Sequence, residues 1–222
     1  MNRIYVLLVN DYLPRLCKIT LPTIERYAAR IGAELVVITE RKFPEWPITY
    51  EKLQIYELCR NDEWSVLIDA DTVISDALPD VTKVIPPTCV GMNLSYPADI
   101  LFPLNDWFIR DGRKIGVVGC FLSAHRICRD FWTPFTEGPE EIVRRMTTGV
   151  KAVPFNVDEY CFSCNLARYG LKMSGIVADQ SQLLHLHAAA NKEEEMIVAA
   201  ERYLIGKGGH KHERGLVQHK SE

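Results

Sequence analysis

Residues 66–74 read VLIDADTVI, an apolar strand that ends in two carboxylates one residue apart. Side chains alternate along extended backbone, so Asp69 and Asp71 are expected on the same side, at the carboxyl end of the strand, where ligands bind in open α/β sheets. Two neighbouring charges beside a buried strand are unfavourable without a partner, and a divalent cation is the simplest partner. The alternative is a helix cap plus an aspartate in a solvated loop.

The residues before this strand have a strand–helix–strand pattern. A continuous aliphatic run, Ile4 to Val9, gives way to Asn10-Asp11-Tyr12, and apolar residues then recur at near-helical spacing from Leu16 to Ile31. Pro22 lies inside this helix and is expected to kink or restart it. A second short apolar run, Leu35 to Ile38, completes a βαβ unit, because runs that are apolar on both faces are typical of strands buried between helices.

The rest of the chain continues this alternation. Strands are predicted at 64–68, 89–92, 117–122 and 182–187, and helices at 51–60, 139–148, 158–169 and 191–204. The alternation predicts an α/β fold with a mixed, mostly parallel sheet that helices cover on both faces. No linker or shift in composition marks an internal boundary, so one domain is expected over residues 1–205, followed by a basic, His-containing tail at 206–222.

Composition limits the partners and the compartment. The 222 residues carry 26 basic and 29 acidic side chains, a net charge of −3, which offers no broad footprint for nucleic acid. No run approaches the ~20 apolar residues of a membrane helix, no signal-peptide pattern is present, and the seven cysteines suit reduced thiols. The chain is therefore expected to be cytoplasmic. The tail is typical of a mobile terminus, with peripheral contact to a membrane surface, an anionic acceptor or a partner as the alternative.

Paired carboxylates with a hard cation imply a phosphate-bearing substrate, because Mg²⁺ or Mn²⁺ completes its shell with phosphate oxygens and water. Two enzyme classes share this arrangement: haloacid-dehalogenase-like phosphatases, whose Asp-x-Asp-x-Thr/Val signature matches residues 69–73, and nucleotide-sugar glycosyltransferases with an Asp-x-Asp motif. The phosphatases carry the motif on their first strand and need a late acidic element, for which this chain offers only residues 177–180. Here a whole βαβ unit precedes Asp69, as in the glycosyltransferases, where it forms the nucleotide-binding half.

From Ile4 to Lys192 the chain resembles a small GT-A (Rossmann-like) glycosyltransferase of the glycogenin and bacterial lipopolysaccharide galactosyl- and glucosyltransferase type. The segments that carry the resemblance occur in the family's order. They are Val9–Pro14, Lys52, Asp69–Asp71, Gly116–Leu122, Asn156–Glu159, His185–His187 and Lys192. The resemblance implies a nucleotide-binding half over residues 1–75 and an acceptor half over residues 76–205.

The resemblance also implies a donor site. Asn10, Asp11 and Tyr12 correspond to the segment that holds the nucleobase, and Lys52 corresponds to a further donor-binding residue. Asp69 and Asp71 correspond to the ligands of Mn²⁺ or Mg²⁺, with Asp69 also placed to reach the ribose.

A late histidine and a lysine complete this site in the family. Both His185 and His187 fit the metal-binding histidine, and His185 is favoured because it follows the apolar pair Leu183-Leu184. Lys192 corresponds to the lysine that meets the diphosphate. The chain departs from the family pattern here, with three alanines at 188–190 in place of a glycine, and two glutamates at 193–194 in place of Pro-Trp.

Asp158 and Glu159 correspond to the family's acidic cluster near the sugar and the acceptor. In an inverting enzyme one of them is expected to deprotonate the acceptor hydroxyl, whereas in a retaining enzyme the equivalent residue contacts the donor sugar. The alternative is that they are simply the acidic start of a helix.

The predicted function is metal-dependent transfer of a hexosyl group from a nucleotide diphosphate sugar, UDP-linked, to a hydroxyl of a glycan or lipid-linked acceptor. Two alternatives remain: a phosphohydrolase with Asp69 as nucleophile and Asp71 as acid/base, and a catalytically silent module that binds nucleotide sugars.

Overall fold

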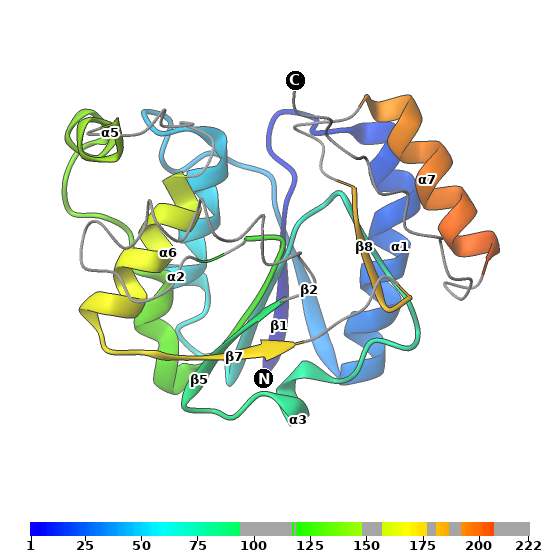
Figure 1. The fold of residues 1–222 in the computed structure, drawn as a ribbon, viewed down its shortest axis with the longest axis horizontal. Helices are drawn as coiled ribbons and strands as arrows, with labels where there is room; N and C mark the ends of the chain where they lie inside the picture. The colour runs from blue at the N-terminus through cyan, green and yellow to red at the C-terminus, as the bar shows by residue number, and fades with distance from the viewer. Residues whose placement is uncertain (94–116, 118, 148–156, 177–180, 187–191, 207–222) are drawn as a thin grey trace, which may run out of the picture.

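The computed structural model describes residues 1–93, 117, 119–147, 157–176, 181–186 and 192–206 (Figure 1). Its central sheet has six strands in the spatial order β2–β1–β3–β6–β5–β7. The strands are β1 (Asn2–Leu7), β2 (Ala33–Ile38), β3 (Trp64–Ile68), β5 (Cys89–Asn93), β6 (Phe121–His125) and β7 (Lys172–Ile176). Only β6 is antiparallel to its neighbours, β3 and β5, whereas the other paired strands are parallel. The predicted mixed, mostly parallel sheet is confirmed.

The opening βαβ unit also forms as predicted. Helix α1 (Pro14–Ile31) connects β1 to the parallel strand β2 and ends at Gly32, whose φ of 67° is a left-handed conformation that suits glycine. The helix runs without a break through Pro22, so the prediction of a restart there is wrong. Pro22 lacks the N–H that would bond to the carbonyl of Lys18, and Lys18 lies on the exposed side of the helix, where water can satisfy that carbonyl.

Alternating side chains give the sheet two buried faces. On β1, Ile4 and Val6 pack on one face with α1, and Tyr5 packs on the other. The second face is covered by η1 (Ile48–Gln54), α2 (Ile55–Leu58), η2 (Arg126–Trp132) and α6 (Val157–Arg168). Figure 1 shows α1 on one side of the sheet and α2 and α6 on the other. Helices therefore cover both faces, as predicted.

A second, two-stranded sheet lies beside α1. In it β4 (Thr72–Ile74) pairs antiparallel with β8 (Leu183–His185). The predicted strand at 182–187 is therefore shorter within the described residues, and it pairs with β4 instead of joining the central sheet. Helix α7 (Glu193–Ile205) packs over this pair and α1 in a small apolar cluster of Leu16, Val73, Leu186, Met196 and Ala200.

Several predicted boundaries need correction. The helix predicted at 51–60 begins at Ile48, and its first part, η1, is a 3₁₀ helix. The strand predicted at 117–122 is instead β6, Phe121–His125, because Gly119 and Cys120 form a turn before it. Strand β7 and the short helix α3 (Val81–Val84) were not predicted. Helix α5 (Pro139–Thr147) and helix α6 begin within one residue of their predicted starts.

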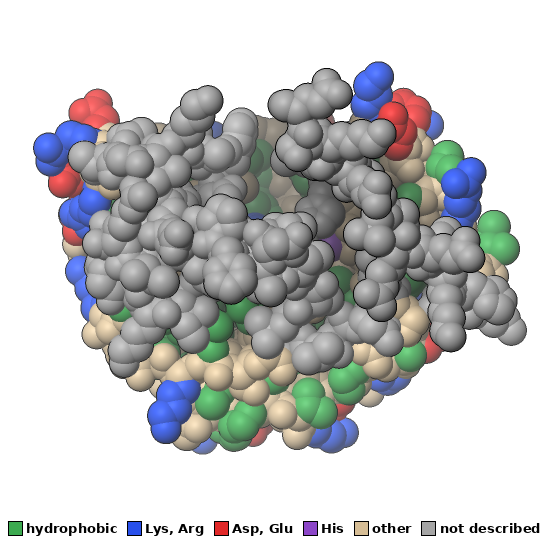
Figure 2. Space-filling model, viewed as in Figure 1, with side chains coloured by type: hydrophobic (Ala, Val, Ile, Leu, Met, Phe, Trp, Pro, Cys, Tyr) green, Lys and Arg blue, Asp and Glu red, His purple; other side chains and the backbone are tan. Residues whose placement is uncertain are grey.

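The surface agrees with the balanced charge. On the face shown in Figure 2, the described Lys and Arg side chains lie along the margins, interspersed with Asp and Glu, and form no continuous basic patch. Across the part of the chain that the structure describes, no helix combines the length and the apolar character needed to cross a membrane. The tail at 207–222 lies outside the described residues.

Candidate functional site

The turn between β3 and β4 carries both aspartates of the 66–74 stretch. Asp69 follows β3 directly, and its N–H donates to the carbonyl of Cys120 at 2.9 Å. The hydroxyl of Thr20, on α1, donates to the carbonyl of Ala70 at 2.6 Å. The turn is therefore held by the residue before the neighbouring strand β6 and by α1, and the two carboxylates lie at the carboxyl end of β3, as predicted.

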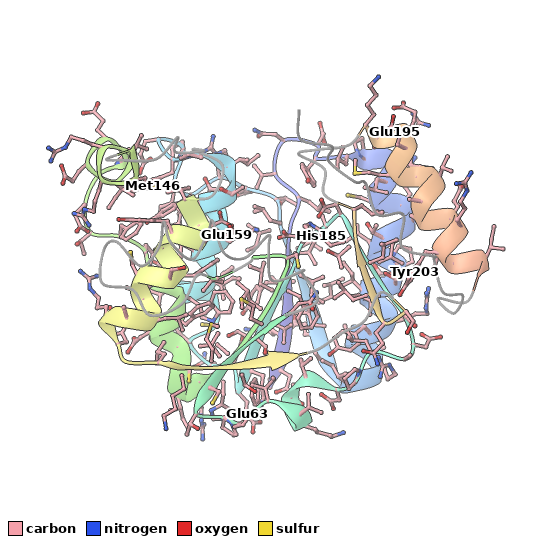
Figure 3. All side chains as sticks on the ribbon, in the orientation of Figure 1. Glu63, Met146, Glu159, His185, Glu195 and Tyr203 are labelled. Atoms are coloured by element: carbon pink, nitrogen blue, oxygen red, sulfur yellow. The ribbon has the colours of Figure 1, made fainter. Side chains whose placement is uncertain are left out.

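Strand β8 brings His185 to this turn. Register places His185 opposite Thr72, and the N–H of Leu186 donates to the carbonyl of Asp71 at 3.0 Å. As a result His185 Nε2 lies 3.3 Å from Asp71 Oδ1. Figure 3 labels His185 on β8 and Glu159 on α6, on either side of the central strands.

Asp69, Asp71 and His185 can together hold a cation. One ligand atom from each lies within 4.8 Å of the others. Carboxylate oxygens suit hard cations such as Mn²⁺ and Mg²⁺, whereas an imidazole nitrogen suits transition metals, so of these two ions the donor set favours Mn²⁺. The second candidate, His187, lies outside the described residues.

The charge state of His185 depends on its neighbours. Burial opposes the charged imidazolium, but hydrogen bonds with Asp71 and Cys120 outweigh it and raise the pKa of His185 to about 11. The metal-free histidine therefore carries a proton at neutral pH. A metal ion must displace that proton before the imidazole can coordinate it.

Lys52 connects the metal site to α6. It lies on η1 with its side chain buried, and its Nζ is 2.8 Å from Asp69 Oδ1 and 3.0 Å from Asp158 Oδ2. Burial alone would lower the pKa of Lys52, but the two carboxylates outweigh it and raise the pKa well above its usual value. Burial raises the pKa of Asp69, and the charge of Lys52 opposes that rise. Lys52 thus stays charged and joins Asp69 to Asp158.

Asp158 and Glu159 lie in the first turn of α6 in different environments. Asp158 is buried and paired with Lys52, whereas Glu159 is half-buried and accepts the N–H of Gly119 at 2.8 Å. Burial, followed by the charge of Asp158, raises the pKa of Glu159 to about 8. Both residues therefore have specific partners in addition to the favourable position at a helix start.

Gly119 lines this network directly. A Cβ there would stand 3.4 Å from Asp158 Oδ2 and 3.5 Å from Lys52 Nζ. Gly119 belongs to the Gly116–Leu122 segment of the resemblance, which assigned it no role. The turn that directs its N–H toward Glu159 also explains why β6 starts later than predicted.

The loop after β1 has an unusual backbone. Asn10, Asp11 and Leu13 have φ values of 59°, 50° and 44°, in the left-handed region. Residues held there cluster at binding sites, because such strain persists only where the surrounding structure enforces it. Asn10 and Asp11 are exposed, and Tyr12 is half-buried. Burial, then the charges of Asp71 and Asp69, raise the pKa of Tyr12, so its phenol lies within electrostatic reach of the metal site.

Lys192, the residue predicted to meet the diphosphate, has no described contact with the candidate cation site. It is exposed and occupies the N-cap position of α7. No interaction among the described residues joins it to Asp69, Asp71 or His185. Its role in binding a diphosphate stays a prediction.

Comparisons with known proteins add one finding about the fold. No family model matches the sequence, and no curated protein matches it. The structure is similar to the crystal structure of a glycosyltransferase involved in the glycosylation of the major capsid of PBCV-1, with a TM-score of 0.53 over 90% of this chain and 99% of that chain, at 10% sequence identity. At this identity the likeness shows that the two chains share a fold.

Proposed function

We propose that this chain is a metal-dependent glycosyltransferase that moves a hexosyl group from a nucleotide diphosphate sugar, UDP-linked, to a hydroxyl of a glycan or lipid-linked acceptor. The observation that carries the proposal is the convergence of Asp69, Asp71 and His185 at the carboxyl end of β3, in a fold shared with a glycosyltransferase. In open α/β sheets this is the end where ligands bind.

The residues around this point have separate tasks in the proposed reaction. Asp69, Asp71 and His185 would hold Mn²⁺ or Mg²⁺, which when bound acts as a Lewis acid for the departing diphosphate. Asn10, Asp11 and Tyr12 bind the nucleoside, and Lys192 adds a positive charge for the diphosphate. Lys52 prevents Asp69 and Asp158 from repelling each other.

Proton transfer is assigned to Glu159. Asp158 is held in an ion pair with the buried Lys52, so its carboxylate is already engaged. Glu159 has a pKa of about 8, raised by burial and then by Asp158. A pKa near the working pH is what a group that exchanges protons with a hydroxyl requires. In an inverting reaction Glu159 therefore accepts the acceptor's proton, and Asp158 orients Lys52.

Ligand-dependent unfolding tests the proposal. Wild type, Asp71→Ala and the control Asp76→Ala, an exposed aspartate, would be heated with UDP, GDP, ADP or CMP, each with and without Mn²⁺. A nucleotide at a hundred times its Kd stabilises by ~2.7 kcal/mol, a shift of roughly 5–10 °C for a domain of this size. We expect a Mn²⁺-dependent shift with UDP in wild type and in Asp76→Ala, and none in Asp71→Ala.

Other outcomes would identify the alternatives. Steady release of phosphate from an aryl phosphate, abolished by Asp69→Asn, would identify a phosphohydrolase. Mn²⁺-dependent UDP binding with neither transfer nor hydrolysis of any UDP-sugar would identify a silent binding module.

A further inference from the structure

Helix α1 begins without a cap of its own. Its N-cap residue, Leu13, has an apolar side chain and a left-handed backbone, with φ 44° and ψ 57°, and the first turn holds no acidic residue. The first N–H groups of a helix have no partner within the helix, so they need an acceptor from elsewhere.

That acceptor comes from the far end of the chain. Glu193 Oε1 accepts the N–H of Arg15 at 3.1 Å and the N–H of Leu16 at 3.2 Å, across 178 and 177 residues of sequence. Next to it, the guanidinium of Arg15 pairs with Glu194 Oε1 at 2.9 Å. We call Arg15, Leu16, Glu193 and Glu194 the α1–α7 junction. Figure 1 shows α7 lying alongside α1.

The junction lies between two parts of the proposed donor site. On the α1 side, the chain directly before Arg15 is the loop from Asn10 to Leu13, with its left-handed residues. On the α7 side, Lys192 directly precedes Glu193. Leu186, which follows the metal-site histidine, shares an apolar cluster with Leu16 of the junction. Movement of α7 away from α1 would therefore disturb both parts together.

The junction also blocks one common diphosphate-binding position, the N-terminus of α1. The N-terminus of the helix after the first strand is a common seat for phosphate in nucleotide-binding α/β folds. Here the carboxylate of Glu193 already accepts the N–H groups of that seat. The metal site and Lys192 are then left to receive the diphosphate of a donor.

We propose that Glu193 is a positioning residue of the donor site: by capping α1 from α7, it holds the nucleoside-binding loop and Lys192 in a fixed position relative to each other. This inference rests on the proposed function. Because coupling between sites is reciprocal, Mn²⁺ and UDP should also strengthen the junction when they bind.

The test measures binding as well as stability. Full-length wild type, Glu193→Ala, Glu193→Gln and the control Glu195→Ala, an exposed glutamate in the same first turn of α7, would be compared. Mn²⁺ affinity would be measured by electron paramagnetic resonance, UDP affinity with Mn²⁺ by calorimetry, and metal-free stability by thermal unfolding. We expect Glu193→Ala to bind UDP about five- to tenfold more weakly, since a lost cap corresponds to a change of that size.

The conservative variant separates positioning from general stabilisation. Glu193→Gln keeps an oxygen that can accept both N–H groups, so it should restore most of the affinity, and Glu195→Ala should match wild type. If Glu193→Ala does not fold, Glu193→Asp, which is one methylene shorter, should show an intermediate loss. A lower unfolding temperature with unchanged Mn²⁺ and UDP affinity would overturn the inference. A wild type that binds neither ligand would overturn the proposed function instead.

Discussion

The two ends of the central sheet both bury charge, and they balance it differently. At the amino end, buried Asp62 accepts the hydroxyl of Tyr5 and pairs with Arg3 at 3.1 Å, so its charge is matched. At the carboxyl end, Lys52 pairs with both Asp69 and Asp158, and Asp71 lies beside His185, so three carboxylates share one lysine and one histidine. Figure 3 marks Glu63, the neighbour of Asp62 in sequence, at the bottom edge of the view, well below His185 and Glu159.

The central sheet is therefore structural at its amino end and carries the candidate site at its carboxyl end. A matched pair needs nothing further, whereas an excess of buried carboxylates is unfavourable until a proton or a cation joins them. His185 supplies a proton in the metal-free protein, and a divalent cation can replace it. The amino end is thus balanced by its own side chains, and under the proposed function the carboxyl end takes a divalent cation in place of the proton on His185.

The largest expected effect comes from removing a carboxylate at the carboxyl end. Asp71→Ala should lower metal-dependent turnover of the sugar nucleotide by about a thousandfold, on the order of 4 kcal/mol of transition-state stabilisation. Folding stability should also fall, because His185 loses the carboxylate that pairs with its imidazole, and the lost repulsion with Asp69 offsets only part of this. Release of nucleoside diphosphate would be followed with Asp76→Ala as control. Full metal-dependent turnover in Asp71→Ala would contradict the metal assignment.

Removing the positive charge of Lys52, at the same end, should destabilise the fold. Lys52→Met leaves Asp69 and Asp158 buried without compensation, at a loss of about 3 kcal/mol in the free energy of unfolding at pH 7. The folded variant then takes up protons more readily than the unfolded chain, so part of the stability should return as the pH falls from 7 to 5. Urea unfolding at three pH values would show this, with exposed Lys83→Met as control. Equal stability at pH 7 would exclude the bridging role.

A substitution at the amino end, where Asp62 pairs with Arg3, should change the stability of the fold but not ligand binding. Asp62→Ala leaves the hydroxyl of Tyr5 buried without its acceptor, which should lower the free energy of unfolding by about 2 kcal/mol. Mn²⁺ and UDP affinities should remain at wild-type values in calorimetry at a temperature where the variant is folded. A loss of Mn²⁺ affinity would show that the two ends are not independent.

Counted per unit of pH, the change in Mn²⁺ affinity should be smaller than the effects of these three substitutions. The pKa of His185, about 11 in the metal-free protein, means that metal binding releases one proton throughout the neutral range. Mn²⁺ affinity should therefore rise about tenfold for each unit of pH between 6 and 8. Calorimetry in buffers of different ionisation enthalpy would count the proton. His185→Asn should bind more weakly and lose this slope, and a flat profile in wild type would contradict the histidine's assignment.

Local patterns predicted the parts of the fold that depend on neighbours in sequence. The βαβ opening, the strand at 64–68 and the helices at α6 and α7 follow from apolar spacing. Strand β7, Lys172–Ile176, escaped prediction because its sequence, KMSGI, has little apolar alternation. The start of β6 was misplaced because Gly119 and Cys120 look like strand residues, but their backbone groups serve Glu159 and Asp69.

In the candidate site, too, the residues that local patterns mark were predicted, whereas contacts between distant parts of the chain were not. Asp69, Asp71 and His185 were named from sequence, and the structure brings them together, whereas the bridge by Lys52 joins residues far apart in the chain. The two glutamates at 193–194 looked like a departure from a family pattern. Their partners, Arg15 and Leu16, lie near the other end of the sequence, so no local pattern could reveal the cap.

The pairing of β4 with β8 bears on how the protein is made. Asp69 and Asp71 leave the ribosome early, but the histidine beside them belongs to a strand synthesised much later, and the cap on α1 follows later still. Chains grow at roughly 5–20 residues per second, so several seconds pass between these events. During that interval the nascent chain holds the two aspartates without the histidine that completes the candidate cation site. A product cut short before β8 would keep most of the sheet-forming residues and yet have an incomplete cation site.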